Sequence, residues 1–161
     1  MRVFVLGGTG SVGSAVTREM VAAGHEVTVL TRSDAAAARV RDMGAFPLAG
    51  DLRSPDRWVR QAATADAVIQ AAATFSDDMG LVDRGAMAAL TDAARDRAVP
   101  LRMVYTGGGW LYGETGGAPA DEAGGFDPIP AFQWMVKGAE ALIAARHLSV
   151  AVIHPAMVYH A

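Results

Sequence analysis

Residues 2–16 read RVFVLGGTGSVGSAV, a mostly apolar run followed directly by a glycine-rich turn. Gly8, Gly10 and Gly13 fit the pattern G-x-G-x-x-G, and Gly7 replaces Gly8 in the variant G-x-x-G-x-x-G. Such a pattern alone is weak evidence, but here it follows an expected strand and opens an expected helix, the context in which it binds a pyrophosphate. Glycines permit the tight turn and the close approach of the phosphates, and the helix N-terminus offers free N–H groups and partial positive charge.

The stretch therefore predicts a dinucleotide-binding turn within a βαβ unit. The alternative, a glycine-rich turn without a ligand, requires both the spacing and the context to be coincidental. The residues of the turn that we expect to contact the cofactor are Gly7, Thr9, Gly10, Ser11, Val12 and Gly13.

Beyond this turn, short β-branched runs alternate with longer alanine-rich segments of helical character. The expected strands are Arg2–Leu6, Glu26–Thr31, Ala45–Ala49, Ala67–Ala71, Leu101–Tyr105 and Val150–His154, and the expected helices lie at about 11–23, 34–43, 55–64, 80–98 and 132–147. The strands are apolar throughout, which suits burial on both faces of a parallel sheet. The alternation predicts one α/β domain over residues 1–161, a Rossmann-like doubly wound parallel sheet of about six strands with helices on both faces.

The composition narrows the possible partners. The 52% hydrophobic and 19% charged residues indicate a globular domain, and the net charge of −3 gives no electrostatic reason to expect nucleic acid or an anionic membrane. The chain has no cysteine, which excludes disulfides and fits a reducing cytosol. No stretch approaches the ~20 apolar residues of a spanning helix, and no cluster has metal-ligand spacing. We therefore expect a cytoplasmic protein without a metal.

The end of the second expected strand indicates which dinucleotide is bound. NAD-binding domains usually carry an acidic residue there, which accepts hydrogen bonds from the ribose hydroxyls. This chain has Thr31 followed by Arg32, and its next acidic residue is Asp34. Since a guanidinium pairs with a 2′-phosphate through charge-assisted hydrogen bonds, Arg32 favours NADP over NAD. An ordinary surface arginine is the alternative.

Six segments occur in an order that resembles the short-chain dehydrogenase/reductase superfamily, and their spacing is most similar to its extended and atypical NAD(P)-dependent epimerase/dehydratase-like branch. They are GGTGSVG (7–13), TRS (31–33), GDL (50–52), VIQAAA (68–73), LYG (111–113) and HPAMVY (154–159). The resemblance extends over nearly the whole chain.

The resemblance implies further contacts with the cofactor. Asp51 and Leu52 would border the adenine, with Asp51 accepting a hydrogen bond from the exocyclic amine. A run of three alanines would line the ribose, and the last segment would lie beside the nicotinamide; these residues are Ala71, Ala72, Ala73, Pro155 and Val158. An acidic turn, a tight strand end and a proline-terminated strand are the respective alternatives.

Enzymes of this superfamily use a serine or threonine, a tyrosine and a lysine for catalysis, and the resemblance places their positions here. Tyr112 and Gly113 match the Val-Tyr-Gly element, so that the serine position holds Gly108, and Thr106 is the nearest hydroxyl. The Tyr-x-x-x-Lys motif is broken in both possible registers, which place Gln133 and Lys137, or Phe132 and Val136, at its ends.

Thr106, Tyr112 and Lys137 are therefore the candidate catalytic residues. A lysine near a phenol lowers its pKa, so Lys137 could still activate Tyr112. The alternatives are that Tyr112 packs beneath its loop and that Lys137 is a solvated helix residue.

Three functions remain open, and the substrate is unknown. The first is an NADP-dependent oxidoreductase or epimerase/dehydratase-type enzyme for a small carbonyl or hydroxyl compound, with a nonstandard proton donor. The second is an inactive NADP(H)-binding sensor, and the third is a cyclase or isomerase that reuses the cleft. Compared with the superfamily, the C-terminal substrate-binding region is absent or truncated. We therefore expect an uncovered apolar sheet face, which a homodimer or a partner chain could cover.

Overall fold

The computed structural model describes residues 1–159 and contains one parallel sheet with helices on both faces. The strands are β1 (Arg2–Leu6), β2 (Glu26–Thr31), β3 (Phe46–Ala49), β4 (Ala67–Gln70), β5 (Leu101–Thr106) and β6 (Leu148–Ile153). The helices are α1 (Ser11–Ala22), α2 (Asp34–Asp42), α3 (Val59–Ala63), α4 (Met79–Ala93) and α5 (Gln133–Ala144), with 3-10 turns at Pro55–Arg57, Gly109–Tyr112 and Pro130–Phe132.

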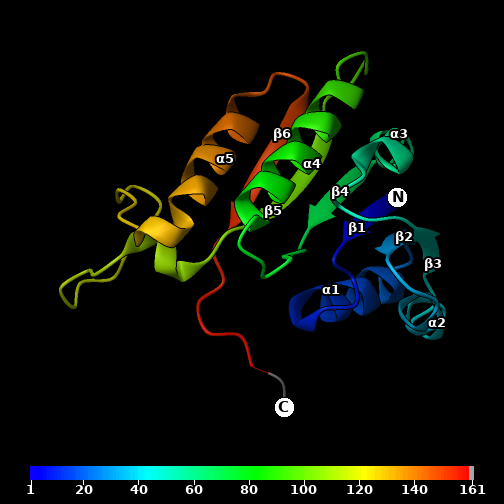
Figure 1. Cartoon of the computed structure of the whole chain (residues 1–161), viewed down its shortest axis with the longest axis horizontal. Coiled ribbons are helices and arrows are strands. Elements are labelled where there is room, and N and C mark those ends of the chain that lie inside the picture. The colour runs from blue at the N-terminus through cyan, green and yellow to red at the C-terminus, as the bar shows by residue number, and fades with distance from the viewer. Residues whose placement is uncertain (160–161) are drawn as a thin grey trace.

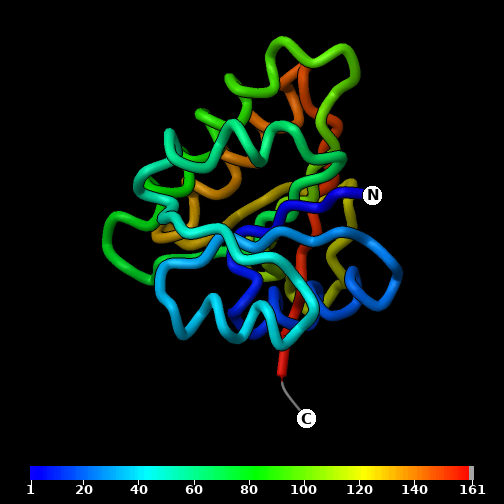
Figure 2. Tube along the Cα trace, turned by 90° about the vertical axis from the view of Figure 1, so that its right-hand side faces the viewer, coloured from blue at the N-terminus to red at the C-terminus, as the bar shows by residue number. Residues whose placement is uncertain are grey.

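The six strands lie in the order β3-β2-β1-β4-β5-β6, and all neighbouring strands are parallel. The chain thus winds outward from β1 to β3, returns across the sheet to β4, and winds outward again to β6. Figure 1 shows this order, and Figure 2 shows α1 and α2 on one side of the sheet with α3, α4 and α5 on the other. The predicted doubly wound α/β fold is confirmed.

The core consists of two apolar layers, because the side chains of β1 alternate between the faces of the sheet. Phe4 and Leu6 pack in the larger layer, beneath α3, α4 and α5. Val3 and Val5 pack in the smaller layer with residues of β2 and α2. All four side chains are buried, as expected for a central strand covered on both faces.

β5 and β6, the outer strands beyond β4, are covered by helices on one face only. This differs from the expectation that the strands are buried on both faces. In β5 and β6 the side chains that face α4 and α5 are buried or half-buried, whereas Arg102, Ser149, Ala151 and Ile153 are exposed. This exposed strip mixes polar and apolar side chains instead of being uniformly apolar. Within residues 1–159, no helix is both long and apolar enough to cross a membrane.

The segment 55–64 also differs from the expected single helix. A 3-10 turn ends at Arg57 and α3 begins at Val59, because Trp58 between them has a non-helical backbone (φ −130°, ψ −21°). Its indole is buried against Phe4, with ring centroids 6.1 Å apart. Trp58 Nε1 donates to the Asp51 carbonyl at 2.9 Å. Seating the indole in the core therefore takes precedence over a continuous helix.

The helix expected at 80–98 begins one residue earlier and already ends at Ala93. The hydrogen bonds that follow, from Arg95 N–H to the Asp92 carbonyl and from Arg97 N–H to the Ala94 carbonyl, span three residues and form tight turns. The Arg97 guanidinium then donates to the Ala63 carbonyl at the end of α3. This contact holds the chain against α3 before β5 begins.

We predict that Trp58→Ala lowers the free energy of unfolding by about 3–5 kcal/mol, since it removes a fully buried aromatic side chain and leaves a cavity. Urea denaturation followed by circular dichroism measures the change. Phe46→Ala on β3, where the ring is 59% exposed, is the matched control with an expected loss below about 1 kcal/mol. Equal losses in the two variants would contradict the role given to Trp58.

Candidate functional site

The turn after β1 is a tight cradle that only glycine can form. Gly7 has a φ of +80°, and a Cβ there would lie 2.6 Å from the carbonyl oxygen of Ala71. A Cβ on Gly13 would lie 2.1 Å from the Gly7 carbonyl oxygen. The turn is closed by a hydrogen bond from Gly10 N–H to the Gly7 carbonyl at 3.0 Å. Gly10, the N-cap residue of α1, has no side chain that could accept a hydrogen bond. The first N–H groups of α1 are therefore not capped by a side chain.

This cradle forms one end of a groove of about 730 Å³ along the carboxyl edge of the sheet. The predicted residues that line the groove are Gly7, Thr9, Gly10, Ser11, Val12, Arg32, Asp51, Leu52, Ala71, Ala72 and Ala73. Gly13 lies behind the turn and is buried. Further lining residues that the sequence did not single out are Leu30, Thr31, Ser33, Ala36, Thr74 and Phe75.

Arg39 of α2 supports the glycine turn, and Arg32 and Ser33, between β2 and α2, lie at the opposite end of the groove. Arg39 reaches from α2 to the Thr9 carbonyl at 2.6 Å and braces the turn from outside. Ser33 caps α2 by accepting the Ala36 N–H at 3.2 Å. Arg32 at this end is exposed, and within residues 1–159 its guanidinium makes no ion pair. It therefore remains available to an anionic group in the groove.

The groove fits a dinucleotide. Its volume falls within the range of small-molecule sites, and the glycine cradle and the start of α1 form the kind of site that accepts a pyrophosphate. Asp51, two residues after β3, lines the groove and offers a carboxylate that can accept a hydrogen bond from a nucleotide base. Arg32 supplies a cation at the same end.

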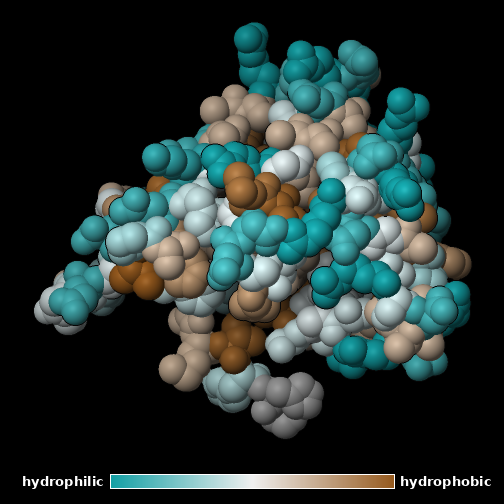
Figure 3. All heavy atoms as spheres, in the orientation of Figure 1, coloured by the Kyte–Doolittle hydropathy of each residue, from teal (hydrophilic) through white to brown (hydrophobic). Residues whose placement is uncertain are grey.

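A second cavity of about 500 Å³ adjoins the groove, and the two share the wall formed by residues 71–75 together with Val12 and Leu52. Its other walls come from α4, the end of β5, the start of α5 and the segment after β6. Most of its large side chains are apolar or aromatic, among them Met79, Val82, Trp110, Phe132, Trp134 and Met135. Pro155 and Val158 also line it, and hydrophobic surface gathers beside this C-terminal segment at the lower edge of the molecule (Figure 3).

A buried polar network lies in the wall of this second cavity. Asp83 of α4 accepts hydrogen bonds from Tyr105 Oη at 2.8 Å and from Gln70 Nε2 at 2.6 Å. Burial raises the pKa of the Asp83 carboxyl above its ordinary value, and the two hydrogen bonds oppose that shift. Burial and the adjacent Asp83 also raise the pKa of the Tyr105 phenol, which therefore stays protonated at neutral pH. Sequence reasoning missed all three residues.

The three candidate catalytic residues do not come together. Thr106 lines the second cavity at the end of β5. Tyr112 instead packs against Phe126 and His154, with ring centroids 5.2 and 5.4 Å away, and does not line the cavity. Lys137 is exposed on α5 and lies outside the lining as well. The geometry thus agrees with the alternative interpretations of Tyr112 and Lys137.

The glycines after β5 make room for aromatic rings. A Cβ on Gly107 would lie 2.6 Å from Nδ1 of His154, and a Cβ on Gly108 would lie 2.3 Å from the Trp110 indole. Trp110 in turn packs against Phe132 at 5.4 Å, and both line the second cavity. Rings therefore occupy the space that a side chain at position 107 or 108 would need.

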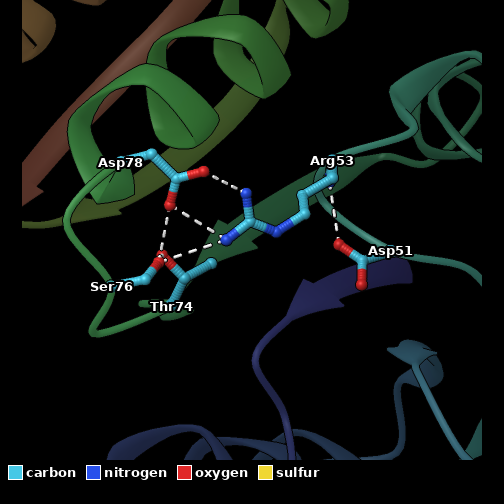
Figure 4. Close-up of polar contacts among 5 residues, drawn as sticks. All are labelled: Asp51, Arg53, Thr74, Ser76 and Asp78. Carbon is cyan, nitrogen blue, oxygen red and sulfur yellow. Dashed lines mark hydrogen bonds and ion pairs between the residues drawn. The ribbon is translucent and has the colours of Figure 1, made fainter.

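Residues 74–78, the second part of the segment between β4 and α4, are held to the loop after β3 by hydrogen bonds and an ion pair. Arg53 pairs with Asp78 and donates to Ser76 Oγ at 3.1 Å, and Ser76 in turn donates to Asp78 and accepts from Thr74 Oγ1 (Figure 4). The hydrogen bonds from Arg53 and Ser76 hold the pKa of the Asp78 carboxyl well below its ordinary range. Within this segment Phe75 has a φ of +50° and is 89% exposed, at the wall shared by the two cavities.

Comparison with known proteins agrees with this geometry. A family model described as NAD(P)H-binding matches residues 7–160. The uncharacterised protein YLL056C of Saccharomyces cerevisiae is 34% identical over 114 residues, which cover 67% of this chain and 38% of the yeast protein. A 4-hydroxy-2-methyl-3-oxo-4-farnesyl-3,4-dihydroquinoline-1-oxide ketoreductase of Stigmatella aurantiaca is 38% identical over 76 residues, covering 47% of this chain and 23% of the ketoreductase.

Among solved structures, UDP-glucose 4-epimerase of Thermus thermophilus in complex with NAD superposes with a TM-score of 0.79 at 25% identity. The superposition covers 96% of this chain and 54% of the epimerase. The chain therefore spans well under half of the curated relatives it matches and about half of this structure.

We predict that Arg53→Ala raises the Kd for NAD(P)H about threefold and accelerates amide exchange in residues 74–78, because the segment loses its contacts with Arg53 beside the groove. The effect is small because exposed ion pairs stabilise weakly. Fluorescence titration and hydrogen–deuterium exchange measure the two changes. Arg95→Ala, which breaks an exposed pair with Asp92 on α4, is the matched control. Unchanged exchange at 74–78 in Arg53→Ala would contradict the prediction.

Proposed function

Because the chain belongs to the NAD(P)H-binding family and to the epimerase/dehydratase-like branch of the short-chain dehydrogenase/reductase superfamily, we propose that it is an NADP(H)-dependent oxidoreductase. Its substrate would be a small, largely apolar carbonyl or hydroxyl compound. The observation that carries this proposal is the wall shared by the two cavities, residues 71–75, which places a ligand of the groove beside a ligand of the second cavity.

The residues of the groove divide the task of holding the cofactor. The turn Gly7–Gly13 and the start of α1 bind the pyrophosphate, and Asp51 accepts a hydrogen bond from the adenine. Arg32 pairs with the 2′-phosphate, which makes NADP the preferred dinucleotide. Once bound, the reduced nicotinamide supplies a hydrogen and two electrons to the carbonyl carbon of the substrate.

The second cavity determines the class of substrate. Its lining residues within the described chain include no lysine or arginine, so they offer no cation for the diphosphate of a nucleotide sugar. The aromatic and aliphatic side chains instead suit a flat or branched apolar compound. The ketoreductase of Stigmatella, whose name states an aromatic bicyclic substrate, supports the same class. Thr106 in this wall would donate a hydrogen bond to the substrate oxygen.

One observation favours a second function, a sensor that binds NADP(H) without turnover. Tyr112 and Lys137 lie outside the lining of the second cavity, and rings fill the space beside Gly107 and Gly108. The usual serine, tyrosine and lysine therefore have no direct equivalent facing the substrate. A sensor would bind NADPH and reduce no carbonyl compound.

We predict that Arg32→Ala raises the Kd for NADPH at least tenfold and leaves the Kd for NADH within twofold, since only NADPH carries the 2′-phosphate. Titration of each reduced dinucleotide by its fluorescence measures both constants. Arg60→Ala, which removes an exposed arginine of α3 that lines neither cavity, is the matched control. Equal losses for NADPH and NADH would overturn the preference for NADP, and failure of the wild type to bind either would overturn the proposed function.

Oxidation of NADPH under anaerobic conditions tests the reaction itself. The wild type is expected to consume NADPH with 4-nitrobenzaldehyde or another member of a panel of aromatic aldehydes and ketones, with one alcohol formed for each NADPH consumed. Tight binding of NADPH without consumption across the panel would favour the sensor.

A further inference from the structure

We propose that Asp83 is the general acid/base of the second cavity, and that Tyr105 and Gln70 are its positioning residues. This inference rests on the proposed oxidoreductase function and names the proton donor that replaces the missing tyrosine and lysine. Reduction of a carbonyl needs such a donor, because negative charge develops on the oxygen as the carbon is reduced.

Asp83 and Tyr105 are the only titratable side chains in the described lining of the second cavity. The remaining walls consist of apolar and aromatic residues, small residues, Gln70 and two threonines. Both side chains are buried. The carboxyl is the stronger acid of the two, because burial and the adjacent Asp83 raise the pKa of the Tyr105 phenol.

Hydrogen bonds on both oxygens fix the orientation of the Asp83 carboxyl. Oδ1 accepts from Gln70 Nε2 at 2.6 Å, and Oδ2 accepts from Tyr105 Oη at 2.8 Å. The amide of Gln70 is itself held, because its Oε1 accepts the N–H of Ala72 at 2.9 Å. The network is thus anchored in the wall that the second cavity shares with the groove. Asp83 itself lines the second cavity.

The surroundings keep the Asp83 carboxyl easier to protonate than an exposed aspartate. β4 presents Gln70 and β5 presents Tyr105, both uncharged at neutral pH, and α5 presents the backbone of Gly138 near the Tyr105 hydroxyl. Arg84 on α4 and Lys137 on α5 are exposed, and within residues 1–159 no cation pairs with Asp83. Burial accordingly raises the pKa of this carboxyl, which is the direction that favours its protonated form.

A reduced nicotinamide bound in the groove would supply one hydrogen and two electrons to the carbonyl carbon, and the electrons of the C=O π bond would move to the oxygen. The oxygen takes the proton of the Asp83 carboxyl, which gives the alcohol and leaves the carboxylate. Tyr105 and Gln70 then stabilise that carboxylate by donating to it, until water entering the cavity returns the proton. In the reverse direction the carboxylate accepts the proton of the alcohol.

The first test needs no cofactor. Infrared difference spectra between the wild type and Asp83→Asn, recorded over pH, report the protonation of this one carboxyl. The carboxyl is expected to titrate above the ordinary aspartate range of about 4. Tyr105→Phe is expected to move that titration to still higher pH, because it removes a hydrogen bond that stabilises the ionised form. Titration of Asp83 in the ordinary range would overturn its role as an acid.

The second test measures the rate with NADPH and 4-nitrobenzaldehyde. Asp83→Asn is expected to lower kcat at least about 100-fold while the Kd for NADPH stays within twofold. In the wild type kcat is expected to fall as pH rises through the raised pKa of Asp83, because only the protonated carboxyl donates a proton. In Tyr105→Phe this fall is expected to shift upward by the same amount as the infrared titration, which a merely structural role would not produce.

Asp92→Asn is the matched control, because Asp92 lies on the same helix and is exposed. It is expected to keep the wild-type rate and pH profile. An active wild type whose rate survives Asp83→Asn would overturn the inference alone. A wild type that binds NADPH and reduces no member of the panel would overturn the proposed function and the catalytic role of Asp83 with it.

Discussion

The close approach of the turn after β1 to the end of β4 is the contact on which the site depends. Ala71 N–H donates to the Leu6 carbonyl at 3.0 Å, and a Cβ on Gly7 would lie only 2.6 Å from the Ala71 carbonyl oxygen. Glycine at position 7 is required both by its positive φ and by this lack of space. The two strands can therefore end side by side, and the segment after β4 lies against the glycine turn.

That wall explains why one short segment takes part in two cavities. Residues 71–75 line both the groove and the apolar cavity. Ala72 uses its N–H to orient Gln70, whose other end donates to Asp83. A backbone group of the cofactor groove is thus connected to the buried carboxyl through a single amide side chain. Alanine suits positions 71–73 because larger side chains there would project into one of the cavities.

The fold could be predicted from the sequence because its determinants are local. The glycine spacing, the apolar strands and the alanine-rich helices each act over a few residues, and the groove lies where the turn predicts a cradle. Asp83 could not be found in this way. In the sequence it stands between Val82 and Arg84 on a helix, as a solvated carboxylate would, and only the packing of β4 and β5 beneath α4 buries it. Trp58 escaped notice for a similar reason, because its partner Phe4 lies 54 positions away in the sequence.

The aromatic rings that follow β5 help to explain how the buried Asp83 carboxyl is held. With His154 against Gly107 and Trp110 against Gly108, the end of β5 is closed by aromatic side chains where the superfamily presents a hydroxyl. A cavity lined in this way has a low effective dielectric constant, which strengthens each polar interaction inside it. It also raises the free-energy cost of an unpaired charge, so that an acid in its wall must be held by neutral donors. Gln70 and Tyr105 are such donors, and they come from the two strands that lie beneath α4. An apolar cavity and a hydrogen-bonded buried carboxyl are therefore two consequences of the same packing.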